Sequence, residues 1–187
     1  MKLLLEITIK SKIEMHNFGT KLAKLFSLND LITFDGALGV GKTFICKSII
    51  NNLTTINEVV SPTFNIVQTY PLQKDEEIWH CDFYRINNFE EVEEIGVFED
   101  FKKKIILLEW PKFKFELSEY HPLNINIEII SNNQSSLSEF RKISLSGSKK
   151  WDNKIKNLHK DIEDKYEKYN LQLWSTFLPP QKKLKVN

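Results

Sequence analysis

Eight residues in the first quarter of the chain have the types and spacing of a phosphate-binding loop. Residues 36–43 read GALGVGKT and match the pattern G-x-x-x-x-G-K-[ST]. Three of the six glycines of the chain lie here, as expected for a backbone that wraps closely around phosphate oxygens. Lys42 would neutralise the β- and γ-phosphates of ATP, and the Thr43 hydroxyl would bind Mg²⁺. The predicted nucleotide-binding residues of this segment are Gly36, Leu38, Gly39, Val40, Gly41, Lys42, Thr43 and Phe44.

Two carboxylates are candidates for the acidic group that a P-loop enzyme needs near its magnesium ion. Glu109 closes the most apolar run, KIILLE, and Asp82 directly follows IWHC at 78–81. We predict that Glu109 holds a Mg²⁺-bound water or acts as the general base on the attacking water, with Asp82 also catalytic. The alternative for each is a carboxylate that caps a loop or helix. We interpret His80 as a structural histidine hydrogen-bonded within the sheet, with a role as a base as the alternative.

A hydroxyl-rich segment and a scarcity of arginine bear on the reaction class. SPTF at 61–64 lies where these folds keep a γ-phosphate sensor, although a plain ST-turn is an equal alternative. Only Arg85 and Arg141 are arginines among 26 cationic residues. Small-molecule kinases usually clamp phosphates with several arginines, because a guanidinium binds phosphate through two hydrogen bonds. Hydrolysis is therefore favoured over a small-molecule or nucleotide kinase, and a non-catalytic, nucleotide-gated binding module is a third hypothesis.

The elements that must position these residues follow from hydrophobic periodicity. The pattern predicts strands at 3–9, 31–35, 64–72, 77–82, 104–109, 123–130 and 140–145, and helices at about 12–27, 43–53 and 88–96. A capping box at Ser11 begins the first helix. Segments 64–72 and 77–82 could pair as a hairpin, and the last two strands could form an antiparallel edge. Strands interleaved with helices predict an α/β fold, a P-loop NTPase with a mostly parallel central sheet flanked by helices.

The composition of the chain changes near residue 147. An apolar stripe at helical spacing runs from Trp151 to Leu173, and Pro179 and Pro180 break the pattern. From Lys149 onward ten lysines stand against five acidic residues, whereas the whole chain has a formal charge of only +1. We therefore predict a P-loop ATPase domain at 1–147 and a Lys-rich amphipathic helical extension and tail at 148–187.

Composition also limits the cellular context. With 41% hydrophobic and 27% charged residues, the chain resembles an ordinary globular protein. Two cysteines, Cys46 and Cys81, suggest neither a disulfide framework nor a metal clip. No apolar stretch approaches the roughly 20 residues of a membrane helix, and Glu6 interrupts the N-terminal apolar run too early for a signal peptide. A cytoplasmic location is the expectation.

Four motifs in a fixed order resemble the bacterial TsaE (YjeE) family. They are GALGVGKT at 36–43, SPTF at 61–64, HCDFYR at 80–85 and LEWP at 108–111, and the resemblance runs from about residue 6 to 146. Members of this family are the ATPase component of the machinery that makes tRNA threonylcarbamoyladenosine (t6A). The resemblance implies a P-loop fold that binds ATP and Mg²⁺ and associates with a TsaD–TsaB pair. TsaD transfers the threonylcarbamoyl group, and the ATPase is thought to reset or activate that complex.

The resemblance also implies roles for single residues. Thr43 and Glu109 would serve Mg²⁺, Lys42 would serve the phosphates, and Asp82 would lie beside the γ-phosphate and its water.

Two further residues and the extension complete the implied picture. Ser11 falls where the family has a hydroxyl residue near the nucleotide, and Arg141 is a candidate for the base-binding side. Members usually end near the last strand, so residues 148–187 depart from the pattern. This extension is expected either to pack on its own domain or to contact tRNA phosphates or a partner.

Overall fold

The structure is a computed structural model that describes residues 1–131 and 139–162 of the 187-residue chain. The strands are β1 (Lys2–Ile9), β2 (Asp30–Asp35), β3 (Val67–Pro71), β4 (Glu77–Asp82), β5 (Lys104–Glu109), β6 (Leu123–Ser131) and β7 (Glu139–Gly147). The helices are α1 (Lys12–Ala23), α2 (Lys42–Leu53), α3 (Phe89–Ile95) and α4 (Lys114–Leu117), with short 3-10 turns at Phe101–Lys103 and Ser118–Tyr120. A further helix covers residues 149–162.

All seven strands form one sheet in the order β1-β7-β6-β2-β5-β4-β3. The four central strands, β6, β2, β5 and β4, run parallel to one another. Strands β3, β7 and β1 add to the two sides in antiparallel fashion. The predicted α/β fold with a mostly parallel core is therefore confirmed, as is the hairpin of β3 with β4. The predicted late edge differs in one respect, because β1 returns to pair with β7 and is itself the outermost strand.

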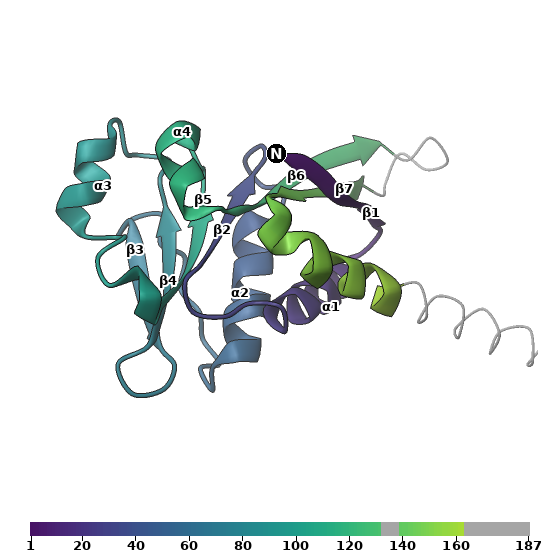
Figure 1. The fold of residues 1–187 in the computed structure, drawn as a ribbon. Coiled ribbons are helices and arrows are strands. Elements are labelled where there is room, and N and C mark those ends of the chain that lie inside the picture. Colours follow the sequence, from purple (N-terminus) through teal and green to yellow (C-terminus); the bar gives the residue numbers. More distant parts are fainter. Residues whose placement is uncertain (132–138, 163–187) are drawn as a thin grey trace, which may run out of the picture.

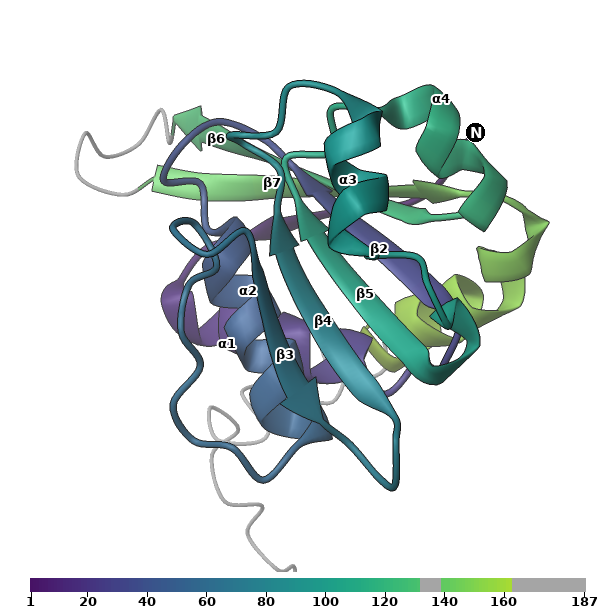
Figure 2. The ribbon, with the colours of Figure 1, turned by 90° about the vertical axis from the view of Figure 1, so that its left-hand side faces the viewer.

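Helices cover both faces of the sheet (Figures 1 and 2). Helices α1 and α2 and the helix at 149–162 lie on one face, over a core that includes Phe18, Ile49 and Leu107. Helices α3 and α4 lie on the other face, over a smaller core that includes Phe83 and Leu108. Because Leu107 and Leu108 are neighbours on β5, the two cores follow from the alternation of side chains along a buried strand.

Two element boundaries differ from the predicted ones for local reasons. Helix α1 ends at Ala23 rather than near residue 27, because the chain turns there and Asp30 Oδ2 accepts a hydrogen bond from Ser27 N at 3.0 Å. Strand β3 begins at Val67 rather than residue 64. The carbonyl oxygen of Pro62 accepts hydrogen bonds from the N–H groups of Asn65, at 3.0 Å, and Ile66, at 2.7 Å. These two bonds make a turn where the strand was expected to begin.

The described part of the C-terminal extension packs on the rest of the protein. Trp151, Ile155 and Leu158 are at most 2% exposed and belong to the core beneath α1. Lys150 and Lys154 each form an ion pair with the buried Asp30, at 2.8 and 3.0 Å. The remainder of the predicted stripe, up to Leu173, and the proline-terminated tail lie outside the described residues. Among the helices that the structure describes, none is long and apolar enough to cross a membrane.

Candidate functional site

The carboxyl ends of three parallel strands bring the predicted catalytic segments together. Strand β2 leads into the loop at 36–41, β4 ends at Asp82 and β5 ends at Glu109. Asp82 is aligned with Glu109 across the β4–β5 pair, and Phe34 is aligned with Glu109 across the β2–β5 pair. Ligands of open α/β sheets bind at this edge, outside the carboxyl ends of the strands. Segments far apart in the sequence therefore converge on one site.

The glycines of the loop are required by its backbone. Gly36, Gly39 and Gly41 have φ angles of 135°, 78° and 114°, a region that residues with a Cβ rarely adopt. A Cβ atom at Gly36 would also collide with the carbonyl oxygen of Ile127 on β6. Helix α2 begins directly after Gly41, so its free N–H groups and the positive end of its dipole face the space inside the loop. This is the geometry of an anion-binding loop.

Replacing Gly36 with Ala is expected to lower the free energy of unfolding by about 2–3 kcal/mol, because strain and a backbone collision combine. Gly39→Ala is the matched control. It carries the strain of a positive φ, but a Cβ there meets no atom within 4 Å, so its cost should be about 1 kcal/mol. Urea unfolding measures both. Equal losses in the two variants would contradict the role given to the contact with Ile127.

Lys42 is held inside the loop by two backbone carbonyls of the loop itself. Its Nζ donates to the carbonyl oxygens of Gly36 at 2.8 Å and Ala37 at 3.0 Å, and it lies 3.6 Å from the centre of the Trp110 ring. Burial lowers the pKa of Lys42 below its usual value, while the carboxylates of Glu109 and Asp82 oppose that shift. A positive charge in a buried site of low dielectric constant interacts more strongly with the phosphates of a nucleotide than the same charge in water would.

Thr43 and Glu109 meet with a geometry suited to magnesium. Thr43 Oγ1 donates to Glu109 Oε2 at 2.9 Å, and Glu109 is 2% exposed. Adjacent ligands of an octahedral Mg²⁺ ion with Mg–O distances of about 2.0–2.1 Å lie about 2.8–3.0 Å apart. These two oxygens therefore fit neighbouring positions around that ion, directly, or with a water in place of the carboxylate. The second carboxylate oxygen of Glu109 contacts His80 Nε2 at 2.8 Å.

Asp82 is connected to the hydroxyl-rich segment. Thr63 Oγ1 donates to Asp82 Oδ2 at 3.0 Å, and Ser61 Oγ lies 3.0 Å from Thr63 Oγ1. The other carboxylate oxygen, Oδ1, accepts from Tyr84 N at 2.9 Å. Asp82 is thus 5% exposed and fixed at both oxygens. A change at Asp82 would reach SPTF through Thr63, which is the connection that a nucleotide-sensing segment requires.

The remaining predicted site residues lie at different distances from this centre. Arg141 on β7 donates from Nε to the carbonyl oxygen of Val40 at 3.4 Å, which brings it to the loop. Ser11 caps α1 by accepting from Glu14 N at 3.1 Å, and α1 approaches the loop through Met15, beside Gly41. Leu38 and Phe44 are 86% and 38% exposed, so their side chains face outward.

Three contacts were not predicted from the sequence. Trp110 covers Lys42, and Asp35 accepts from Gly36 N at 2.9 Å at the start of the loop. Cys46 lies one turn after Thr43, with its Sγ within 4.8 Å of the nearest polar atoms of His80 and Glu109. Burial raises the pKa of the Cys46 thiol well above its usual value, so the thiol stays protonated. Proximity to the motifs is the only sequence signal for Trp110 and Asp35.

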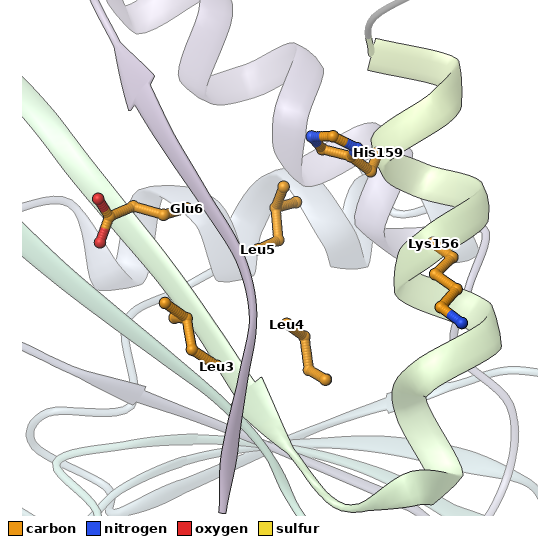
Figure 3. Close-up of a pocket in the computed structure, with 6 residues that line it drawn as sticks. All are labelled: Leu3, Leu4, Leu5, Glu6, Lys156 and His159. Carbon is orange, nitrogen blue, oxygen red and sulfur yellow. The ribbon is translucent and has the colours of Figure 1, made fainter.

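A separate hollow lies beside β1 at the outer edge of the sheet, and no predicted site residue lines it. It has a volume of about 320 Å³ and lies between β1 and the helix at 149–162 (Figure 3). Its lining residues are Leu3, Leu4, Leu5, Glu6, Lys156 and His159. The phosphate-binding loop therefore does not depend on it.

Comparisons with known proteins agree on one family. The family of the threonylcarbamoyl adenosine biosynthesis protein TsaE matches residues 9–140. The TsaE protein of Rickettsia prowazekii is 37% identical over 128 residues, which cover 68% of this chain and 88% of the relative. The TsaE protein of Aquifex aeolicus is 31% identical over 144 residues, covering 76% of this chain and all of the relative.

A solved structure supports the same fold. The crystal structure of Bacillus subtilis YdiB superposes with a TM-score of 0.62 at 19% identity, over 87% of this chain and 99% of YdiB. At that identity the likeness concerns the fold alone. The match over residues 9–140 and the relatives that share more than two thirds of the chain show that this protein belongs to the TsaE family, whose members take part in tRNA threonylcarbamoyladenosine biosynthesis.

Proposed function

We propose that this protein binds ATP with Mg²⁺ and hydrolyses it as the accessory ATPase of tRNA t6A synthesis, acting with a TsaD–TsaB pair. The observation that carries the proposal is the pair of oxygens on Thr43 and Glu109, 2.9 Å apart at the end of a phosphate-binding loop. Such a pair, next to the buried Lys42, suits magnesium and a triphosphate.

Each residue has a distinct task in the proposed reaction. A water attacks the γ-phosphate in line with the leaving group, and catalysis consists of positioning and charge stabilisation. Lys42 and the loop N–H groups would stabilise the charge on the phosphates, and bound Mg²⁺ would supply further neutralisation. Glu109 would hold the ion or one of its waters. Asp82, fixed by Thr63 and Tyr84, would orient the attacking water.

The arginines suggest that hydrolysis is slow without a partner. The Arg85 guanidinium lies over the Phe64 ring at 5.2 Å, and Arg141 contacts the Val40 carbonyl. The described contact of Arg85 is with the Phe64 ring and not with Asp82 or Glu109. A cation that stabilises the transition state is worth a factor of about 10³–10⁵ in rate. A partner that supplies or orients such a cation would therefore raise the turnover of ATP. Work on tRNA within such a complex would take place in the cytoplasm.

The direct test is ATP turnover by the purified chain, alone and with TsaD–TsaB, followed as phosphate release. Weak basal turnover that rises with the pair supports the proposal, and turnover that the pair leaves unchanged contradicts the accessory role. Mass spectrometry of the same reactions tests the kinase alternative, because a kinase would deliver the γ-phosphate to a small molecule instead of releasing it.

Replacing Glu109 with Gln is expected to lower ATP turnover about 100-fold, while ATP affinity at saturating Mg²⁺ changes little. The substitution keeps the shape of the side chain but removes the charge that would hold the ion or activate the water. Glu94→Gln, an exposed residue of α3, is the matched control and should behave like the unmodified protein. A nucleotide-gated module without catalysis makes the opposite prediction, since its function would survive Glu109→Gln.

A further inference from the structure

A buried histidine lies directly behind the candidate magnesium ligands. His80 is 0% exposed, and its Nε2 lies 2.8 Å from Glu109 Oε1. The other oxygen of the same carboxylate accepts from Thr43 Oγ1 at 2.9 Å. The carboxylate of Glu109 is therefore held on both sides, by α2 in front and by β4 behind. A hydrogen bond from the imidazole is the contact that fixes the plane of the carboxylate on the side facing the core.

The second ring nitrogen identifies which tautomer makes this contact. His80 Nδ1 is buried and has no hydrogen-bond partner among the described residues. A hydrogen on Nδ1 would be a buried donor without an acceptor, at a cost of about 1–3 kcal/mol, and the carboxylate oxygen beside Nε2 can only accept. The hydrogen therefore lies on Nε2, which donates to Glu109 Oε1 at 2.8 Å.

The surroundings of His80 give no structural reason for an imidazole. Its aligned neighbour on β5 is Leu107, which is fully buried, and Ile78 two residues earlier on the same face of β4 is equally apolar. A leucine at position 80 would fill this part of the core without a buried nitrogen that lacks a partner. Among the described residues, the hydrogen bond to Glu109 is the polar contact that distinguishes histidine from leucine here.

We propose that His80 is a positioning residue, which holds the Glu109 carboxylate so that its second oxygen faces the Thr43 hydroxyl at the magnesium site. The inference deepens the proposed function and rests on it, since it assigns a support to that same ion site. Hydrogen-bonded partners behind a ligating carboxylate orient it, and their loss typically costs about 10–100-fold in metal affinity or activity.

Two variants separate positioning from packing. His80→Leu fills the space without a donor, and His80→Gln places an amide N–H near the position of Nε2. ATP affinity is measured by calorimetry over a range of Mg²⁺ concentrations and without Mg²⁺. For His80→Leu the half-saturating Mg²⁺ concentration should rise about 10–100-fold, with the Mg²⁺-free affinity unchanged. His80→Gln should stay within about 3-fold of the unmodified protein.

The outcomes that overturn the inference are equally specific. An unchanged Mg²⁺ dependence in His80→Leu overturns it, and so does a folded His80→Gln variant that loses as much as His80→Leu. Nitrogen-15 NMR of the unmodified protein adds a test that needs no variant to fold. It should find the hydrogen on Nε2, and a hydrogen on Nδ1 alone overturns the inference. These experiments measure Mg²⁺-dependent ATP binding and the position of the hydrogen on His80, and neither requires ATP hydrolysis. A protein that binds Mg²⁺ and ATP without hydrolysing ATP would therefore contradict the proposed function, while the role of His80 would still be decided by these measurements.

Discussion

Replacing Lys42 with Ala is expected to weaken ATP binding and to lower kcat/KM for ATP about 1000-fold. Removing one preorganised charge-stabilising group from an active site typically costs about 10²–10³ in rate, and here the same side chain also contributes to ground-state binding. Calorimetry measures the affinity, and phosphate release measures turnover. Both should fall together, in contrast to Glu109→Gln, where turnover falls and affinity is kept.

The environment of Lys42 gives the physical reason for so large an effect. Its side chain is 4% exposed and has the Trp110 ring at 3.6 Å on one side. Its Nζ donates to the carbonyls of Gly36 and Ala37. A phosphate oxygen that approached would replace neutral acceptors with a charged one, and charge-assisted bonds are roughly twice as strong.

Lys102→Ala is the matched control for the lysine experiment. Lys102 is exposed and lies in the turn before β5, at the opposite end of the strand from Glu109. The Lys102→Ala substitution removes the same formal charge as Lys42→Ala, so any general effect of net charge on ATP binding appears in both variants. If the ATP affinity and turnover of Lys42→Ala stay within a few-fold of those of Lys102→Ala, the assignment of 36–43 as the phosphate-binding loop is contradicted.

The parts of the site that could be predicted from the sequence are those set by local chemistry. The loop was predicted because glycine spacing, a preceding strand and a following helix all occur within a short segment. Glu109 was predicted because it ends an apolar run that is long enough for a buried strand. The cap of α1 at Ser11 followed equally from a side chain that bonds to a nearby N–H group.

The parts that could not be predicted depend on contacts across the sheet. The pairing of β1 with β7 joins segments separated by more than 130 residues, and no periodicity reports such a pairing. The bond from His80 to Glu109 depends on the register of β4 against β5. Trp110 was quoted within a motif, but its place over Lys42 follows from a backbone turn with φ of 60°. Local patterns fix elements, and tertiary register fixes their side-chain partners.

Replacing Trp151 with Ala is expected to lower the free energy of unfolding by about 3–5 kcal/mol. Trp151 is 0% exposed, its ring meets Phe26 edge to face at 6.2 Å, and its Nε1 donates to the His121 carbonyl at 2.9 Å. The substitution opens a cavity and leaves that carbonyl without its donor. For a chain of this length the midpoint of thermal unfolding should fall by about 10 °C.

Asn157→Ala is the control for this prediction, because Asn157 lies on the exposed side of the same helix. Its effect on the unfolding free energy should stay within about 0.5 kcal/mol. If Trp151→Ala has the same midpoint of thermal unfolding as Asn157→Ala, the packing of the extension on its own domain is contradicted.

The same pair of variants bears on the role of the Lys-rich extension. Two of its ten lysines, Lys150 and Lys154, are bound to Asp30 and neutralise a carboxylate of their own domain. That arrangement favours a stabilising role over contact with tRNA phosphates. It predicts that truncation after Gly147 lowers thermal stability at least as much as Trp151→Ala, while affinity for tRNA and for TsaD–TsaB is unchanged. A large loss of tRNA affinity on truncation, with a weaker dependence of the binding constant on salt concentration, would instead show that the extension contacts the nucleic acid. Each lost phosphate contact reduces that salt dependence.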